Sequence, residues 1–186
     1  MADLTFRRFD TAGAREQRDT VSLIHQDAYA DRIASGAPFY SVEAFMQRFD
    51  AYTSRDGLDL VIGYEHDEPI GQTWGWPLGP NSRSWEGLEP DPDRPADFTA
   101  EDGRRTFALS EIMVRQAWTG RGYAHALHDE LLRGRPEQRA MLLVNPTNER
   151  AQRAYSKWGW QQVGRLTPSW DNAPRFHVLM LNLPVP

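Results

Sequence analysis

The chain has 186 residues, 40% hydrophobic and 25% charged, which is long enough for one domain with a full core and short for two. Its formal net charge of -5 provides no cationic field for a nucleic-acid backbone and suits a positively charged small substrate. The absence of cysteine excludes disulfides, thiolate metal ligands and a cysteine nucleophile.

Neither a secretory signal nor a membrane anchor is predicted from the sequence. The N-terminal stretch MADLTFRRFD contains no apolar segment, and nowhere do about 18 apolar residues run together. We therefore expect a cytoplasmic protein whose partners include neither a membrane nor nucleic acid.

The first part of the chain predicts a strand, two helices and a hairpin. Alternating residues predict a strand over 4–9, and apolar residues at helical spacing predict a helix over about 14–33. A second helix is predicted to begin at Ser41, a favourable N-cap residue. Residues 58–66 and 69–76 are predicted to pair as antiparallel strands.

The stretch over about 78–104 has neither a helical nor a strand period. It is rich in proline and in acidic residues, which is typical of a long loop or an insertion. Loops of this length inside a domain act as lids over a site or are plain solvated segments, and the sequence leaves both readings open.

The second half of the chain is more regular. It predicts a strand over residues 106–114, a helix over 121–134, a strand over 140–144 and a helix over 147–158. Two further strands are predicted over 160–166 and 175–183. A strand, a helix and a second strand at this spacing predict a parallel pair with a right-handed crossover, and hence a mixed α/β class.

Two glycines precede the helix that follows the strand over 106–114. Gly120 and Gly122 form the turn TGRGYA, and a helix N-terminus presents unpaired N–H groups and the positive end of the helix dipole. A glycine-rich turn at that point lets phosphate oxygens approach the backbone closely. The turn lacks the Lys-Ser/Thr pair of a P-loop and the complete dinucleotide fingerprint, so its spacing alone is a weak signal.

A second motif, NERAQRAYSKWGW, follows the strand over 140–144. Together with TGRGYA it resembles the GNAT superfamily of N-acetyltransferases, most specifically over residues 107–160. The family pattern at the turn is Arg/Gln-Gly-x-Gly-x-Gly/Ala, and Thr119 departs from its first position. Backbone amides and Arg121 would therefore carry more of the pyrophosphate contact.

This resemblance implies a single GNAT-like domain over residues 1–186, with a central mixed sheet of about seven strands and about four flanking helices. The fourth and fifth strands, parallel to each other, would splay apart and hold acetyl-CoA as co-substrate. The residues implied in its binding are Ile112, Met113, Val114, Thr119, Gly120, Arg121, Gly122, Tyr123, Ala124 and Asn148.

Direct transfer of an acetyl group to an amine needs a base and an acid. The amine must lose a proton before it attacks, and the leaving thiolate gains one. Glu111 is the candidate base, as the one carboxylate in the strand over 106–114, and the alternative is a structural ion pair with an arginine. Tyr155 is the candidate acid, although it also belongs to the apolar stripe of its helix and would there be a core residue.

Other catalytic chemistries find less support in the sequence. His125 and His128 with Glu130 could suggest a metal site, but two histidines three residues apart on a packed helix are more often core or surface residues. No further ligand is evident, so no metal is expected. Ser110 lies outside any Gly-x-Ser-x-Gly elbow, which argues against a serine nucleophile. Trp74 and Trp76 would share one face of the sheet, as core residues or as one wall of an acceptor pocket.

The acceptor predicted is a small-molecule amine. In the family its surface comes from loops that here are residues 31–40 and 167–175, and Asp27, Asp31 and Asp171 are candidates to attract a cation. A protein or peptide acetyltransferase and a non-catalytic acyl-CoA-binding regulatory module are the alternatives on the same fold. The sequence also leaves open whether the chain forms a homodimer.

Overall fold

A computed structural model describes residues 4–169 and 173–184 of the chain. The chain divides into two compact units, the first made of residues 1–76 and 110–133 and the second of residues 77–109 and 134–186. Strand β5 (Thr106–Val114) contributes to both units, since the division falls within it. The eight strands and six α-helices within these described residues confirm the predicted mixed α/β class.

The strands of the first unit follow the order β1-β2-β3-β5. Strands β1 (Leu4–Phe9), β2 (Asp59–Glu65) and β3 (Glu68–Pro77) pair antiparallel in sequence. The turn between β2 and β3 places His66 and Asp67 at φ 50° and 63°, the two positive values that a tight type I′ hairpin requires. The predicted hairpin is therefore confirmed.

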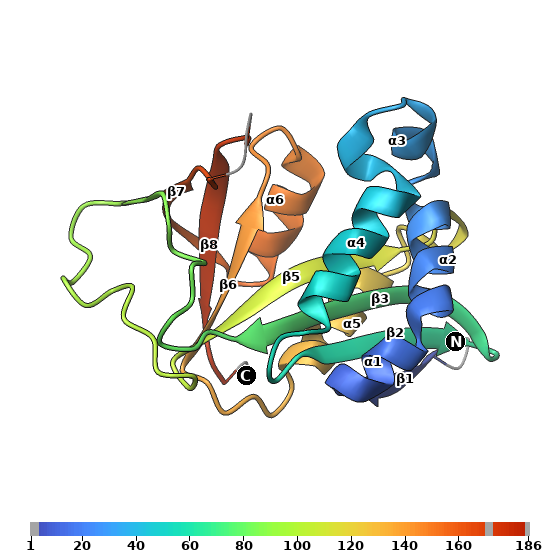
Figure 1. Cartoon of the computed structure of the whole chain (residues 1–186), viewed down its shortest axis with the longest axis horizontal. Helices are drawn as coiled ribbons and strands as arrows, with labels where there is room; N and C mark the ends of the chain where they lie inside the picture. Colours follow the sequence, from blue (N-terminus) through green and yellow to red (C-terminus); the bar gives the residue numbers. More distant parts are fainter. Residues whose placement is uncertain (1–3, 170–172, 185–186) are drawn as a thin grey trace. The chain divides into compact units, whose positions relative to one another are not determined.

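Helices cover both faces of this part of the sheet. The Gln72 side chain donates to the carbonyl of Val21 in α2 (Arg18–Ala28), and the Trp74 ring packs on Phe49 of α4 (Val42–Tyr52). A Cβ at Gly71 would meet Leu127 of α5 (Tyr123–Leu132) at 2.9 Å, so α5 covers the opposite face. Figure 1 shows α2 and α4 in front of β2 and β3.

One predicted helix, over 14–33, is wrong in detail. The structure has three helices there, α1 (Thr11–Glu16), α2 and α3 (Ala30–Ala34), which meet at Gln17 and Tyr29. Asp10 caps α1 by accepting a hydrogen bond from the Gly13 amide at 2.9 Å, so the helical region begins earlier than predicted. Neither junction contains glycine or proline, and the apolar period continues through both, which is why the sequence pattern did not show them.

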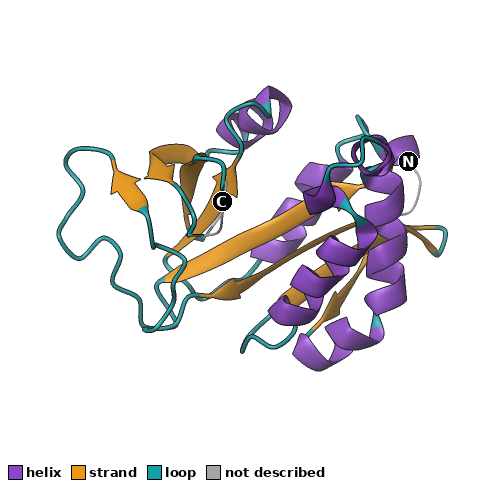
Figure 2. Cartoon of the chain, turned by 45° about the horizontal axis from the view of Figure 1, so that its top comes forward, coloured by secondary structure: helices purple, strands orange, loops and turns teal. Residues whose placement is uncertain are grey.

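The strands of the second unit follow the order β5-β6-β8-β7-β4. The beginning of β5 pairs in parallel with β6 (Arg139–Val144), from Thr106 with Arg139 to Ala108 with Met141, which confirms the predicted parallel pair. Strand β8 (Phe176–Asn182) lies between β6 and β7 (Gln161–Leu166), antiparallel to both. Among the described α-helices only α6 (Glu149–Lys157) belongs to this unit (Figure 2).

The stretch over 78–104 contains a short strand that the sequence pattern did not predict, and it makes eight described strands where about seven were expected. Strand β4 (Leu88–Pro90) pairs with β7, and the rings of Trp85 and Phe98 are buried. Both rings pack against the guanidinium of Arg139, which donates to the Phe98 carbonyl at 2.6 Å and to Glu101 at 3.2 Å. This stretch is thus attached to the core of the second unit by contacts that its composition did not show.

Two short 3-10 helices, η1 (Pro38–Tyr40) and η2 (Gln116–Trp118), complete the described elements. None of the helices within residues 4–169 and 173–184 is long and apolar enough to cross a bilayer.

Candidate active site

The glycine turn leads from the end of β5 into α5, entirely within the first unit. Gly120 and Gly122 have φ of 79° and 85°, in the left-handed region that favours glycine, and Gly122 is the N-cap residue of α5. No side chain caps this helix, and a Cβ at either glycine would meet no atom within 4 Å. Uncapped N–H groups facing open space are the arrangement that binds a phosphate at a helix N-terminus.

A partly buried carboxylate holds the other side of this turn. Glu65, at the end of β2, accepts hydrogen bonds from the Trp118 indole at 2.8 Å and from the Tyr123 hydroxyl, and Arg121 lies 3.8 Å from it. These hydrogen bonds, that of Tyr123 first, lower the pKa of Glu65. Glu65 therefore fixes the turn as a carboxylate, a role for which the sequence offered no signal.

The backbone of β5 alternates between its two edges. The Arg115 amide donates to the Ile70 carbonyl of β3 at 2.9 Å, so the N–H and C=O groups of residues 111, 113 and 115 point toward β3. Those of Ile112 and Val114 accordingly point away from β3. Whether the backbone groups of Ile112 and Val114 bind an extended ligand stays a prediction.

Glu111 lies on β5 with its carboxyl largely removed from water. The Tyr29 hydroxyl hydrogen-bonds to it, and Arg48 acts on it through its positive charge. Burial raises the pKa of Glu111 to about 7, although Arg48 and the Tyr29 hydrogen bond both oppose the rise. A carboxyl that titrates near neutral pH has the property required of a general base, and the sequence identified neither of its two neighbours.

Two tyrosines of the first unit interact with this carboxyl, Tyr29 by a hydrogen bond and Tyr52 through charge. The His25 ring lies between those of Phe45, at 3.8 Å and parallel, and Tyr29, at 5.3 Å. Burial, followed by the charge of Arg48, lowers the pKa of His25 to about 4, so this histidine is neutral at pH 7. Burial, followed by the charge of Glu111, raises the pKa of Tyr52.

Both tryptophans of β3 are core residues. Trp74 is fully buried between the rings of Phe45 and Phe49. Trp76 is 7% exposed and stacks on Tyr52 at 4.9 Å. Trp76 therefore packs on Tyr52, the tyrosine on which the charge of Glu111 acts.

The two remaining predicted site residues lie in the second unit, on α6. Tyr155 is 8% exposed and packs edge to face against Trp158 and Trp160, as its place in the apolar stripe predicts. Asn148 is the N-cap of α6, and its side chain accepts from the Ala151 amide at 3.2 Å. This capping accounts for an asparagine at position 148 without a ligand.

The predicted acidic attractants of the acceptor have other partners or lie outside the description. Asp27 accepts from the Arg115 guanidinium at 3.0 Å and from the Gln116 amide at 2.7 Å, so it anchors the segment after β5. Asp31 is exposed on α3. Asp171 lies outside the described residues.

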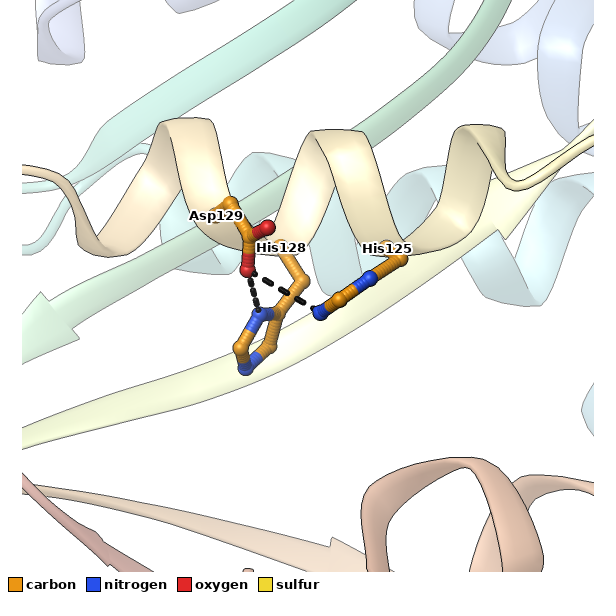
Figure 3. A group of neighbouring side chains, drawn as sticks. All are labelled: His125, His128 and Asp129. Carbon is orange, nitrogen blue, oxygen red and sulfur yellow. Dashed lines mark hydrogen bonds and ion pairs between the residues drawn. The ribbon is translucent and has the colours of Figure 1, made fainter. Parts of the chain in front are cut away.

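The histidine pair on α5 has a third neighbour that the sequence analysis did not identify. Figure 3 shows His125 and His128 turned toward Asp129, whose Oδ1 lies 2.8 Å from His128 Nδ1 and 3.4 Å from His125 Nε2. Glu130, the residue considered from sequence, pairs with Arg133 at 3.2 Å instead. Burial lowers the pKa of His128, and its Nδ1 hydrogen-bonds to Asp129, so this group has an internal partner without an ion and we assign no metal to it.

The comparison with known sequence families agrees with this geometry. Residues 24–160 match the acetyltransferase (GNAT) family. The chain belongs to this family. No curated protein matches its sequence.

Solved structures of acetyltransferases share the fold at low sequence identity. One from Thermus thermophilus superposes with a TM-score of 0.64 at 12% identity, over 98% of this chain and 100% of that chain. The YncA protein of Salmonella typhimurium, solved with its cofactor acetyl-CoA, gives 0.60 at 15% identity over 98% and 95%. The PaiA N-acetyltransferase of Thermoplasma acidophilum, solved with coenzyme A, gives 0.59 at 10% identity over 97% and 99%.

Proposed function

We propose that this protein is an N-acetyltransferase that transfers the acetyl group of acetyl-CoA directly to a primary amine of a small molecule. The observation that carries the proposal is Glu111, a carboxyl with a pKa of about 7 on the strand that continues into the uncapped glycine turn. Two observations support acetyl-CoA as the co-substrate. The chain belongs to the GNAT family, and two structural neighbours were solved with coenzyme A and with acetyl-CoA.

The residues of the turn fit the pyrophosphate of coenzyme A. The space beside Gly120 and Gly122 is open to a phosphate, and the N–H groups at the start of α5 supply donors and a positive potential. Backbone groups of Ile112 and Val114 would pair with the amides of the pantetheine arm as an added strand. Met113, Thr119, Arg121, Tyr123, Ala124 and, from the second unit, Asn148 complete the proposed set.

Glu111 and Tyr155 are each assigned one proton transfer, the first at the attacking amine and the second at the leaving sulfur. The amine nitrogen bonds to the acetyl carbon and the carbon–sulfur bond breaks. Glu111 accepts the proton that the amine loses, and Tyr155 donates a proton to the departing sulfur. No acetylated enzyme is formed, in keeping with a chain that has no cysteine and no serine elbow.

Two measurements test this function. Calorimetry should show acetyl-CoA binding, and a screen of amines should show thiol release that depends on both substrates together, with the acetylated amine identified by mass spectrometry. Acetyl-CoA binding without thiol release from any amine or peptide would overturn the enzymatic proposal in favour of an acyl-CoA-binding module. Release with peptides alone would overturn the choice of a small-molecule acceptor.

A further inference from the structure

The guanidinium of Arg48 lies close enough to Glu111 for its charge to act on that carboxyl. The guanidinium of Arg48, on α4, lies over the Phe39 ring at 4.1 Å and 5.9 Å from the centre of the Phe45 ring. In the part of the chain that the structure describes, no carboxylate lies within ion-pair distance of Arg48. Arg18 and Arg115 of the same unit, in contrast, are bound by Asp50 and Asp27.

A chain of ring contacts connects this guanidinium to Glu111. Phe39 packs edge to face on Tyr40 at 5.3 Å, and Tyr40 stacks on Tyr29 at 5.8 Å. The Tyr29 hydroxyl bonds to Glu111. The charge of Arg48 acts on Glu111, Tyr52 and His25, which belong to β5, α4 and α2. Arg48 is therefore close to the proposed base.

A second guanidinium lies on the same rings. Arg32 of α3 stands over the Tyr40 ring at 5.1 Å and donates to its hydroxyl at 3.3 Å. Arg32, Phe39 and Tyr40 all belong to the loop region over 31–40 where the acceptor is expected. Phe39 is 50% exposed, so this surface is open to a ligand. The groups that lie over these rings are the cations Arg32 and Arg48, whereas the sequence analysis expected acidic attractants.

We propose that the acceptor is a small amine that also carries a carboxylate, an amino-acid-like molecule whose carboxylate binds Arg48. A guanidinium presents two parallel donors that match a carboxylate, and neighbouring aromatic rings strengthen such a pair by excluding water. The amine of the same molecule then faces Glu111, and the rings of Phe39 and Tyr40 receive its apolar part. This inference rests on the proposed acetyl transfer and names its substrate class.

The first test compares acceptors that differ in one group. The rate of thiol release from acetyl-CoA is measured with L-phenylalanine, L-methionine and L-glutamate and with the matching α-carboxamides. The carboxamide lowers the pKa of the amine below that of the free acid, so more of the amine is unprotonated near neutral pH and the amides are intrinsically the better acceptors. A kcat/KM at least about tenfold higher for the acids would support a bound carboxylate. Equal or better use of the amides would overturn it.

The second test removes the guanidinium. Arg48→Met keeps packing on Phe39. At a pH above the acidic limb, we expect it to raise KM for the preferred acid on the order of 10- to 100-fold, with kcat within about threefold and the amides unaffected. The pH must lie above the limb because loss of the Arg48 charge also raises the pKa of Glu111. Arg48→Lys keeps the charge but not the paired donors, so its KM for the preferred acid should lie between those of wild type and Arg48→Met. Arg7→Met, at an exposed arginine of β1 that also lies over a ring, Tyr64, is the control and should change neither constant.

Calorimetry separates failure of this inference from failure of the proposed function. The acids and amides are titrated into protein saturated with coenzyme A, so no turnover is needed. Binding of the acids that is lost in Arg48→Met and kept in Arg7→Met supports the carboxylate site even if no acetyl group is transferred. Binding that survives in Arg48→Met, or no binding of any acid, overturns it, whatever the rate with other amines.

Discussion

The Tyr29 hydroxyl hydrogen-bonds to the carboxyl of Glu111, and so joins the end of α2 to β5 at the proposed base. Tyr29 lies at the junction of α2 and α3, with φ of -111°, where the helix axis is interrupted. The sequence pattern did not show this break between α2 and α3. The residue at the break, Tyr29, is the one whose side chain reaches Glu111. A continuous helix would direct residue 29 differently, because the position of a side chain follows the helix period.

Replacing Glu111 by glutamine should abolish the acidic limb of the pH profile. A base must be unprotonated, and the pKa of Glu111 is raised to about 7, so wild-type kcat/KM should rise with pH through about 7 and then level off. The Gln variant should lose about 10²- to 10⁴-fold in rate and show no such rise. Amines of low pKa should partly rescue it. Glu16→Gln, at an exposed glutamate of α1, is the control, and a full rate with the parent profile in Glu111→Gln would place the base elsewhere.

Replacing Tyr29 by phenylalanine should move the acidic limb toward higher pH. The Tyr29 hydrogen bond favours the charged form of Glu111 and lowers its pKa, so its loss should raise that pKa further. The rate above the limb should stay close to wild type, because the base itself is intact. Profiles that coincide for the two proteins would show that Tyr29 does not position the base.

Replacing Gly122 by valine should weaken acetyl-CoA binding by at least about tenfold, since its side chain would fill the space beside the helix N-terminus. The same change also strains the backbone, because φ is 85° there. Gly134→Val separates the two effects, as Gly134 has φ of 67° and equally open surroundings at the other end of α5. Calorimetry on both folded variants should show weaker binding for Gly122→Val alone, and equal affinities would mean that the pyrophosphate binds elsewhere.

Replacing Tyr155 by phenylalanine keeps the ring and its packing on Trp158 and Trp160. A general acid at this position predicts a fall in kcat on the order of 10²-fold with acetyl-CoA affinity unchanged. A core residue predicts almost no change in kcat, because only a hydroxyl is removed. Single-turnover rates and the melting temperature, measured on the same preparation, distinguish the two readings.

The sequence by itself determined the features that depend on residues close together along the chain. The alternation in β1, β2 and β3 and the spacing of β5, α5 and β6 predicted the hairpin and the parallel pair, because the strand period and the length of a crossover are local properties. The glycine turn at positions 120 and 122, directly before α5, was likewise predicted, since a turn and the helix start after it are local features of the sequence.

Only the tertiary structure decided which distant side chains meet. Strand β4 exists because β7 provides its hydrogen-bond partner, and proline-rich and acidic composition carries no signal of that pairing. Glu65 holds the turn from β2, and Tyr29 and Arg48 come to Glu111 from α2 and α4. The pKa of Glu111 depends on burial and on those neighbours, which act through space. The residue pattern along one strand therefore indicates neither that this pKa is raised nor why.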